Sequence, residues 1–235
     1  MFEHSIVILP AGGTSTRFGN TNKLLCELNG MPVFCHAVRR FLQLLPAERI
    51  AISVNRNFRE DFEYQLERNF PGKRFRIVNG GRNRTESVLH ALELFAEEKP
   101  LYAAVHDAAR PLLSRSLAEE TFRMCGEHGA ALAARKMTDT VKQIGADGLL
   151  SSKGVDRETL WTVETPQIFL YSDLLAATRR ANAEQRAFTD DAAAVEYYLG
   201  RKVFPVENRG VNLKITHQTD LELARQYLAS TSAES

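Results

Sequence analysis

The sequence of 235 residues contains little cysteine and almost no net charge. Its three cysteines, Cys26, Cys35 and Cys125, form no C-x-x-C pair, which argues against a disulfide framework and against a zinc site. Thirty Lys and Arg residues face 29 Asp and Glu residues, so no global field favours nucleic acid or a membrane surface. Any binding site for an anion must therefore be local.

Long hydrophobic runs and the common nucleotide-binding fingerprints are absent as well. The apolar run at residues 5–10 is too short for a signal sequence or a membrane helix, so we expect a cytoplasmic protein. The glycine-rich segment at 10–23 matches neither G-x-G-x-x-G nor G-x-x-x-x-G-K-[ST], which argues against hydride transfer and ATPase chemistry. The length suits one core, and we predict one domain over residues 1–230 with a polar tail at 231–235.

Short Val- and Ile-rich runs alternate with amphipathic segments along most of the chain. The pattern predicts strands at 5–10, 49–54, 75–79, 101–107, 129–135, 202–206 and 213–216, and helices at 32–45, 57–70, 85–97, 116–128, 172–183, 190–199 and 218–229. This succession indicates an α/β fold with a mostly parallel sheet and helices on both faces. Ligands of such sheets bind where the strands end, so the loops after Leu9, Asn79 and Val105 should line one crevice.

The alternation stops between residues 137 and 160. Two short extended runs flank Asp147-Gly148, a dipeptide that favours a tight hairpin turn. We predict a β-hairpin arm that protrudes from the domain. Because a lone hairpin is marginally stable in water, the arm should pack against another surface, such as the same arm of a second subunit.

Three segments that follow predicted strands carry residues suited to phosphate chemistry. In the first, at 10–23, Gly12 and Gly13 let backbone amides approach an anion. The hydroxyl groups at 14–16, together with Arg17 and Lys23, add donors and positive charge. An ordinary glycine-rich turn with solvated charges explains this segment equally well.

The second segment is NGGRNRTESV, at residues 79–88. Its two glycines permit close backbone approach, Arg82 and Arg84 stand beside a predicted helix N-terminus that favours anions, and Ser87 can bond to a base or a phosphate. A helix-capping turn with Thr85 or Asn83 as the cap is the better supported interpretation of this segment taken alone.

The third segment is VHDAARP, at residues 105–111. Asp107 is a hard oxygen ligand suited to Mg²⁺, and Arg110 can hold a phosphate. The alternative is a turn at the end of a strand, with Arg110 as a surface cation. Farther along the chain, Thr189 and the two aspartates after it are typical of a helix start capped by a hydroxyl group.

Taken together, the motifs resemble one family. The order PAGG, TR, K, then GG-R-SV, VHDAARP, DTVK, VDR-W, TPQ, TDDA and N-x-K-I-T is similar to the 2-C-methyl-D-erythritol 4-phosphate cytidylyltransferases, from Ile6 to about Leu228. VHDAARP and TPQ are specific in that order, whereas the first loop recurs across sugar nucleotidyltransferases. The resemblance implies a Rossmann-like fold, a homodimer joined by the arms, and Mg²⁺-dependent transfer of a cytidylyl group from CTP to a sugar-alcohol phosphate.

The resemblance also implies roles for individual residues. The CTP site would consist of Ala11, Gly12, Gly13, Gly81, Ser87, Asp107 and Ala108. Arg17 and Lys23 would stabilise the pentavalent transition state, and Asp107 would face the metal. The acceptor phosphate would be held by Thr140, Arg157 and Lys214, the first two from the partner's arm, and Arg110 joins them on the reasoning given above.

The sequence departs from the family pattern at Ser15 and Asn22, where a glycine and a proline are usual, and Asn212 lies where related transferases often have a second carboxylate. Two alternatives stay open at this point. One is a ribitol 5-phosphate cytidylyltransferase with the same fold and nucleotide chemistry. The other is an inactive homologue that binds nucleotide without transferring it.

Overall fold

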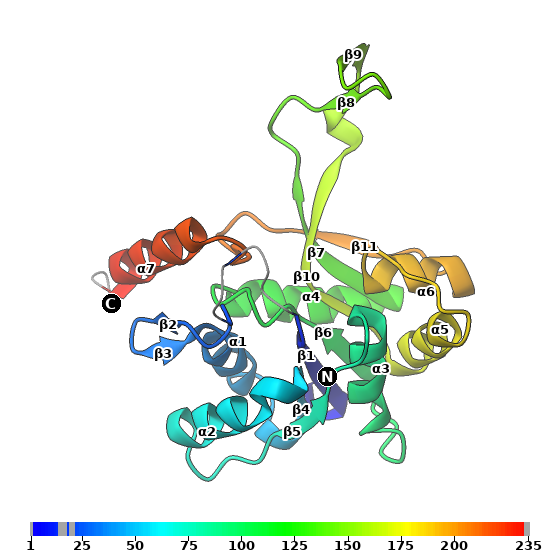
Figure 1. Cartoon of the computed structure of the whole chain (residues 1–235). Coiled ribbons are helices and arrows are strands. Elements are labelled where there is room, and N and C mark those ends of the chain that lie inside the picture. Colours follow the sequence, from blue (N-terminus) through cyan, green and yellow to red (C-terminus); the bar gives the residue numbers. More distant parts are fainter. Residues whose placement is uncertain (1, 14–17, 19–21, 233–235) are drawn as a thin grey trace.

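The computed structural model describes residues 2–13, 18 and 22–232. At its centre lies a seven-stranded sheet of order β11-β7-β10-β6-β1-β4-β5 (Figure 1). Its strands are β1 Ser5–Ala11, β4 Ile50–Val54, β5 Arg76–Asn79, β6 Tyr102–Val105, β7 Ala130–Lys136, β10 Trp161–Leu170 and β11 Phe204–Glu207. Neighbouring strands are parallel except where β10 pairs with β6 and β7. The prediction of a mostly parallel α/β sheet is thus confirmed.

Helices cover both faces of this sheet, so the side chains of β1 are buried on both sides. Val7 and Leu9 belong to a core formed with α1, α2 and α4, whereas Ile6 and Ile8 pack with α3, α5 and α6 (Figure 1). The α-helices are α1 Val33–Leu42, α2 Arg59–Asn69, α3 Arg84–Glu93, α4 Arg115–His128, α5 Tyr171–Ala183, α6 Asp191–Leu199 and α7 Gln218–Ser232. Short elements complete the chain: β2 Glu27–Leu28, β3 Met31–Pro32 and the 3-10 turns Phe2–His4, Ala47–Arg49, Arg56–Phe58 and Arg157–Thr159. Among the described residues, no helix has both the length and the apolar content to cross a membrane.

Strand β10 is absent from the sequence-based prediction, although it lies inside the sheet. Its register with β7 shifts between Val163 and Gln167, and the Thr165-Pro166 peptide within this bulge is cis. Polar side chains and a proline therefore interrupt the alternation that would have marked a strand. Because β10 runs against its neighbours, it returns the chain from the arm to the body.

The predicted strand at 213–216 is wrong. This segment joins no sheet, and the amide of Ile215 donates instead to the carbonyl of Ala109, at 2.8 Å, in the loop after β6. The chain therefore runs past the end of β6 and carries Lys214 there.

Two details near the helix ends also differ from the prediction. Asp190, not Thr189, caps α6, and its carboxylate accepts the amide of Ala193 at 3.0 Å. A carboxylate is as good a cap as a hydroxyl group, and the sequence offered both side by side. At the other end of the chain, α7 continues to Ser232, into the segment predicted as a polar tail.

The predicted arm is present and protrudes from the body (Figure 1). Strands β8, Lys142–Ile144, and β9, Leu150–Gly154, form a two-stranded sheet of their own. The turn falls at the expected dipeptide, where Gly148 has φ 78° and its amide donates to the carbonyl of Gly145 at 3.0 Å. Three large apolar side chains at the tip, Ile144, Leu149 and Leu150, are about two-thirds exposed, at 68–70%.

Candidate functional site

A cavity of about 370 Å³ opens where the loops after β1, β5 and β6 meet, as the strand-end argument predicts. It is lined by Pro10, Gly12, Gly13, Lys23, Leu24, Gly81, Arg82, Asn83, Arg84, Ser87, Asp107, Ala108, Ala109 and Lys214. Four of these side chains are cationic and one is a carboxylate, so a nearly neutral chain concentrates positive charge here. The first cavity therefore suits an anionic ligand.

A second cavity of about 280 Å³ adjoins the first. Its lining consists of Arg84, Asp107, Arg110, Val163, Glu164, Thr165, Gln167, Thr189, Asp190 and Lys214. Cations here are balanced by carboxylates, with hydroxyl and amide groups between them, which suits a ligand that combines a phosphate with several hydroxyl groups. Arg84, Asp107 and Lys214 line both cavities and mark their junction.

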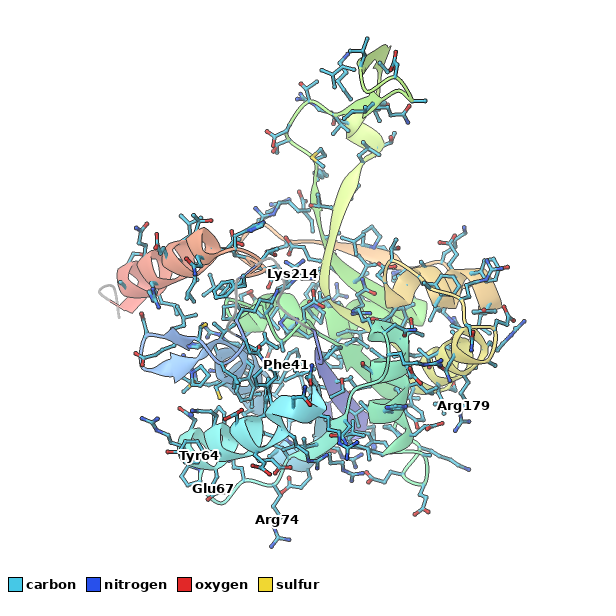
Figure 2. The ribbon with its side chains drawn as sticks, viewed as in Figure 1. Phe41, Tyr64, Glu67, Arg74, Arg179 and Lys214 are labelled. Atoms are coloured by element: carbon cyan, nitrogen blue, oxygen red, sulfur yellow. The ribbon has the colours of Figure 1, made fainter. Side chains whose placement is uncertain are left out.

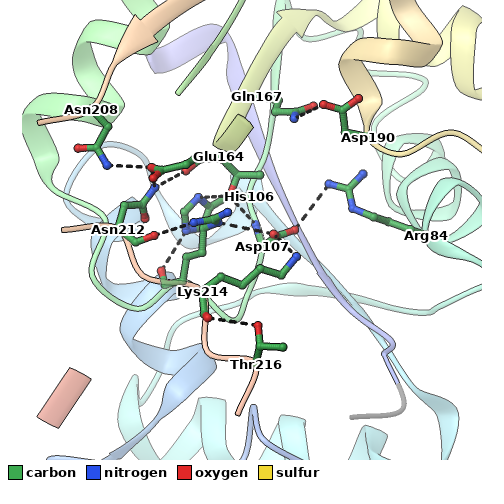
Figure 3. A network of polar contacts seen from close by, with 12 residues as sticks. Arg84, His106, Asp107, Glu164, Gln167, Asp190, Asn208, Asn212, Lys214 and Thr216 are labelled. Carbon is green, nitrogen blue, oxygen red and sulfur yellow. Dashed lines mark hydrogen bonds and ion pairs between the residues drawn. The ribbon is translucent and has the colours of Figure 1, made fainter. Parts of the chain in front are cut away.

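Asp107 is the electrostatic centre of that junction. Its Oδ2 lies 2.8 Å from Nζ of Lys214 and 3.6 Å from Nε of Arg110, and its Oδ1 lies 3.7 Å from Nη2 of Arg84 (Figure 3). Burial by itself would raise the pKa of Asp107, but the three cations outweigh it and hold this pKa well below its usual range. The carboxylate is therefore ionised at neutral pH. Lys214 lies on the side of the body from which the arm protrudes (Figure 2).

The buried ring of His106 links the segment that carries Asp107 to strand β10. Its ring is fully buried, with Nδ1 3.1 Å from Oγ1 of Thr165 and Nε2 3.1 Å from the carbonyl oxygen of Arg110. Burial lowers the pKa of His106 to about 4, so the ring is neutral at physiological pH. Thr165 also accepts the backbone amide of Asp107 at 3.1 Å. VHDAARP and TPQ are therefore two halves of one scaffold, joined across β6 and β10.

Arg110 is not the surface cation that the alternative interpretation proposed. Its side chain is only 11% exposed, and Nη1 donates to the carbonyl oxygen of Asn212 at 2.6 Å. Among the described residues its buried Nε has no hydrogen-bond acceptor within range, although the carboxylate of Asp107 lies nearby. Arg110 lines the second cavity, so its guanidinium group adds positive charge there.

A buried carboxylate, Glu164, fixes the segment that carries Lys214. Oε2 of Glu164 accepts from Nδ2 of Asn208 at 2.8 Å and from Nδ2 of Asn212 at 2.9 Å (Figure 3). Asn212 also donates to the carbonyl oxygen of Thr165 at 2.8 Å. These bonds hold residues 208–212 against β10 and leave Lys214, two positions later, at the cavity junction. The asparagine of the N-x-K-I-T motif is thus a structural anchor.

In the loop at residues 80–83, the backbone amides of residues 80–82 are already bonded within the protein. The acceptors are the carbonyl of Val54 for Gly80 at 2.8 Å, Oγ of Ser87 for Gly81 at 3.0 Å, and Oε2 of Glu86 for Arg82 at 2.7 Å. Asn83 caps α3 and accepts the amide of Glu86 at 2.9 Å, which confirms the capping interpretation. The loop is therefore a shaped wall of the first cavity and not a cradle of free amides for phosphates.

The first glycine-rich loop is only partly described. Gly12 and Gly13 line the first cavity, whereas Ala11 is the buried last residue of β1 and does not. Arg17 and the hydroxyl groups at 14–16 lie outside the described residues. Lys23 lines the cavity, and the preceding Asn22 accepts the amide of residue 24 at 3.1 Å through its side chain. The departure at Asn22 therefore supplies a local hydrogen bond beside the lysine.

Thr140 and Arg157 are not brought to the cavities within one chain. Both lie on the arm with exposed side chains, and neither lines the first or the second cavity. Nη1 of Arg157 donates to the carbonyl oxygen of Thr138 at 2.9 Å, which joins the two sides of the arm. Lys214 and Arg110, the other two residues assigned to the acceptor phosphate, lie at the second cavity.

Several residues near the two cavities were not assigned to the site from the sequence. Glu164, Thr165 and Gln167 were not singled out, and Asp190 and Asp191 were predicted only as part of a helix start. Four of them belong to TPQ and TDDA, so the motifs were visible although their contacts were not. In the part of the chain that the structure describes, no three His, Cys, Asp or Glu side chains gather as a metal site.

Comparison with known proteins agrees with this geometry. Residues 5–230 match the family model for IspD, 2-C-methyl-D-erythritol 4-phosphate cytidylyltransferase. An enzyme of this name from Bacillus cytotoxicus is 34% identical over 223 residues, which cover 94% of this chain and 96% of the relative. The crystal structure of the Francisella tularensis enzyme superposes with a TM-score of 0.78 at 27% identity, over 94% of this chain and 98% of that one. The synthase from Anaerococcus prevotii, at 24% identity and a TM-score of 0.82, covers 96% and 98% and shares the fold.

Proposed function

The chain belongs to the 2-C-methyl-D-erythritol 4-phosphate cytidylyltransferase family, and from this premise we propose that CTP binds in the first cavity and the acceptor in the second. The activity is the joining of CTP and 2-C-methyl-D-erythritol 4-phosphate to give the CDP-linked alcohol and diphosphate, in isoprenoid precursor synthesis. The family model and the Bacillus cytotoxicus relative bear the methylerythritol name, which favours this acceptor over ribitol 5-phosphate.

One observation carries the assignment of the two cavities. The nucleotide loops and the acceptor cations share a single junction, formed by Arg84, Asp107 and Lys214. A nucleotide whose α-phosphate reaches this junction meets the phosphate of a second ligand that enters from the other side. Such alignment of two bound reactants is the main requirement of the reaction.

The chemistry needs no covalent enzyme intermediate. An oxygen of the acceptor phosphate attacks the α-phosphorus of CTP, the bond to the bridging oxygen breaks, and diphosphate leaves. Negative charge spreads over the phosphorus oxygens, so the residues supply cations: Lys23 from the first loop, Arg17 in the same loop, and Lys214 at the junction. Asp107 holds Lys214 in place at 2.8 Å.

The cytosine ring fits the wall formed by residues 80–83. Oγ of Ser87 donates to the carbonyl of Asn83 at 2.8 Å and accepts the amide of Gly81 at 3.0 Å, which leaves one acceptor lone pair. That lone pair suits the exocyclic amino group of cytosine. Gly81 is required beside it, because a Cβ there would collide with the side chain of Glu86. We propose that Ala108, Gly12 and Gly13 contact the ribose and the phosphates of CTP. Ala11, which is buried at the end of β1, would hold the first loop in position.

The residues present fit Mg²⁺ if the substrate phosphates provide most of its ligands. Asp107 is an ionised oxygen donor at the junction, and Mg²⁺ typically combines one or two carboxylates with phosphates and waters. When bound, the ion would neutralise charge on the triphosphate. Lys214 and Arg110 would stay beside the carboxylate as the cations for the acceptor.

The acceptor site is complete only with a second subunit. Arg110 and Lys214 come from the body, and we propose that Thr140 and Arg157 come from the partner's arm, whose exposed tip supports a homodimer. Cys35 and Cys125 are buried free thiols, which supports a reducing compartment such as the cytoplasm.

Diphosphate release from purified protein tests the proposal. CTP with 2-C-methyl-D-erythritol 4-phosphate and Mg²⁺ should give the highest rate, and the rate should fall when ribitol 5-phosphate, UTP or ATP is substituted or the cation is removed. Faster turnover of ribitol 5-phosphate would favour the ribitol enzyme. No diphosphate from any combination would identify an inactive nucleotide-binding homologue.

A further inference from the structure

The guanidinium group of Arg84 occupies the junction of the two cavities. Arg84 is the first residue of α3 and lines both cavities, with a side chain one-third exposed. Its Nη2 lies 3.7 Å from Oδ1 of Asp107, beyond hydrogen-bond distance, on the side where the reacting phosphates would meet.

A buried carboxylate holds Arg84 there. Nη1 of Arg84 donates at 2.5 Å to Oδ2 of Asp191, whose side chain is only 2% exposed. The two residues are 107 positions apart, so the pair ties α3 to α6. Burial raises the pKa of Asp191, and the positive charge of Arg84 opposes that rise. A buried carboxylate without this partner would be strongly unfavourable, which keeps the arginine in place.

Asp191 is itself fixed by the scaffold. Nε2 of Gln167 donates to Oδ2 of Asp190 at 2.9 Å (Figure 3), and Oε1 of Gln167 accepts the amide of Ala192 at 3.1 Å. Asp191 lies between these two anchored residues. The glutamine of TPQ and the aspartates of TDDA thus form a chain of contacts that runs from β10 through α6 to Arg84.

The remaining donors of Arg84 distinguish two roles for the pair. Within the described residues, only Nη1 of its guanidinium makes a hydrogen bond, although the group carries five N–H donors. A pair that served only to join two helices would gain nothing from facing both cavities with those donors.

We propose that Arg84 is a further phosphate-binding cation of the reaction centre and that Asp191 is the residue that positions it. The guanidinium fork suits the oxygens of a phosphate group better than a single ammonium does. This inference rests on the proposed function, because it requires the two reacting phosphates to meet at the junction. Asp191 touches no substrate and acts through Arg84.

The test compares Arg84→Gln, Asp191→Asn and the double variant with the wild type, by diphosphate release and thermal unfolding. Arg84→Gln alone leaves a buried carboxylate unpaired and is expected to lower Tm. The double variant removes both charges and should regain a Tm close to that of the wild type. Its kcat/KM for the acceptor should nevertheless stay about 10²-fold low, since the phosphate cation is still missing. Arg84→Lys should recover part of that loss.

Asp191→Asn adds a readout that a purely structural tie would not move. Arg84 keeps its charge but loses its anchor, so kcat should fall while KM for CTP changes little. Arg179→Gln removes a surface pair with Glu93, at 3.4 Å (Arg179 is labelled in Figure 2), and serves as the matched control with wild-type kinetics. A double variant that regains wild-type kcat/KM together with Tm would overturn the inference. If the wild type itself released no diphosphate, the proposed function would fail instead.

Discussion

At the scale of single residues, the site depends on how charges are supplied around one carboxylate. Asp107 is surrounded by Lys214, Arg110 and Arg84, so it neutralises part of a cationic cluster and keeps those side chains close together. Lys23 also lines the first cavity and adds a further positive charge to it. The site can therefore present several cations to a triphosphate, because Asp107 offsets the repulsion among those cations.

Lys23→Ala should lower kcat by about 10²–10³-fold, because a preorganised cation that meets charge in the transition state contributes about that much. Circular dichroism and Tm should stay near the wild-type values. Steady-state diphosphate release is the measurement, with Lys202→Ala as a control whose ammonium pairs with Glu196 on the surface. Unchanged turnover in Lys23→Ala would remove this lysine from the mechanism.

At the scale of elements, a buried histidine ties α1 to the small β2–β3 hairpin. Nε2 of His36 lies 2.6 Å from the carbonyl oxygen of Leu28 and must donate, so Nδ1 accepts from Nη2 of Arg39 at 3.2 Å. The pKa of His36 is lowered, mainly by burial. The hydrogen bond to Leu28 offsets part of this effect, and the charges of Arg39 and Arg40 add to it. A proton added at Nδ1 would face a guanidinium group.

The pH dependence of stability follows from this geometry. In the unfolded chain His36 takes up a proton near its ordinary pKa of about 6.5, whereas the folded protein resists that proton. Its contribution to the free energy of unfolding is therefore complete above that pH and is lost as the pH falls through the lower, folded pKa.

We expect His36→Gln, which keeps a donor for Leu28 but cannot take up a proton, to lose less stability than the wild type between pH 7 and pH 4.5. Urea unfolding at both pH values measures this difference. His217 is exposed, so His217→Gln should lose as much stability as the wild type over this pH range. Parallel losses in His36→Gln and the wild type would show that His36 does not contribute.

At the scale of the whole molecule, the arm decides whether one chain can act alone. Arg157 and Thr140 lie on the arm, outside both cavities of their own chain, and the tip exposes Leu149 and Leu150 to 69% and 70%. Because a two-stranded hairpin with an exposed apolar tip is marginally stable in water, we predict that the tip packs against a second subunit.

Mixed dimers test this directly. We expect dimers of Lys23→Ala subunits, and dimers of Arg157→Ala subunits, to be nearly inactive. An isolated mixed dimer, purified through two different tags, should regain about half of the wild-type activity, because one of its two sites combines an intact body with an intact arm. Mixed dimers no more active than the parent dimers would show that the site does not use the partner's arm.

Much of the architecture could be predicted because it depends on local patterns. Short Val- and Ile-rich runs located β1, β4 and β5, and the helical spacing of apolar residues located the helices. Asp147-Gly148 located the turn of the arm. The strand-end argument found the first cavity, and motif order indicated the family. The pattern failed at β10, where Pro166 and the bulge interrupt the alternation, and at 213–216, where an extended segment pairs with no strand.

Local sequence patterns account for the α/β class, the chemistry of the motifs and the presence of residues with suitable charges. The folded structure sets which of these residues meet: Asp107 binds Lys214, which lies 107 positions later, and Asp191 holds Arg84. It also decided that the amides of residues 80–82 are already occupied. The physical reason is that hydrogen bonds and ion pairs depend on distances of a few ångströms, and over such separations along the chain only packing of the sheet and helices sets those distances.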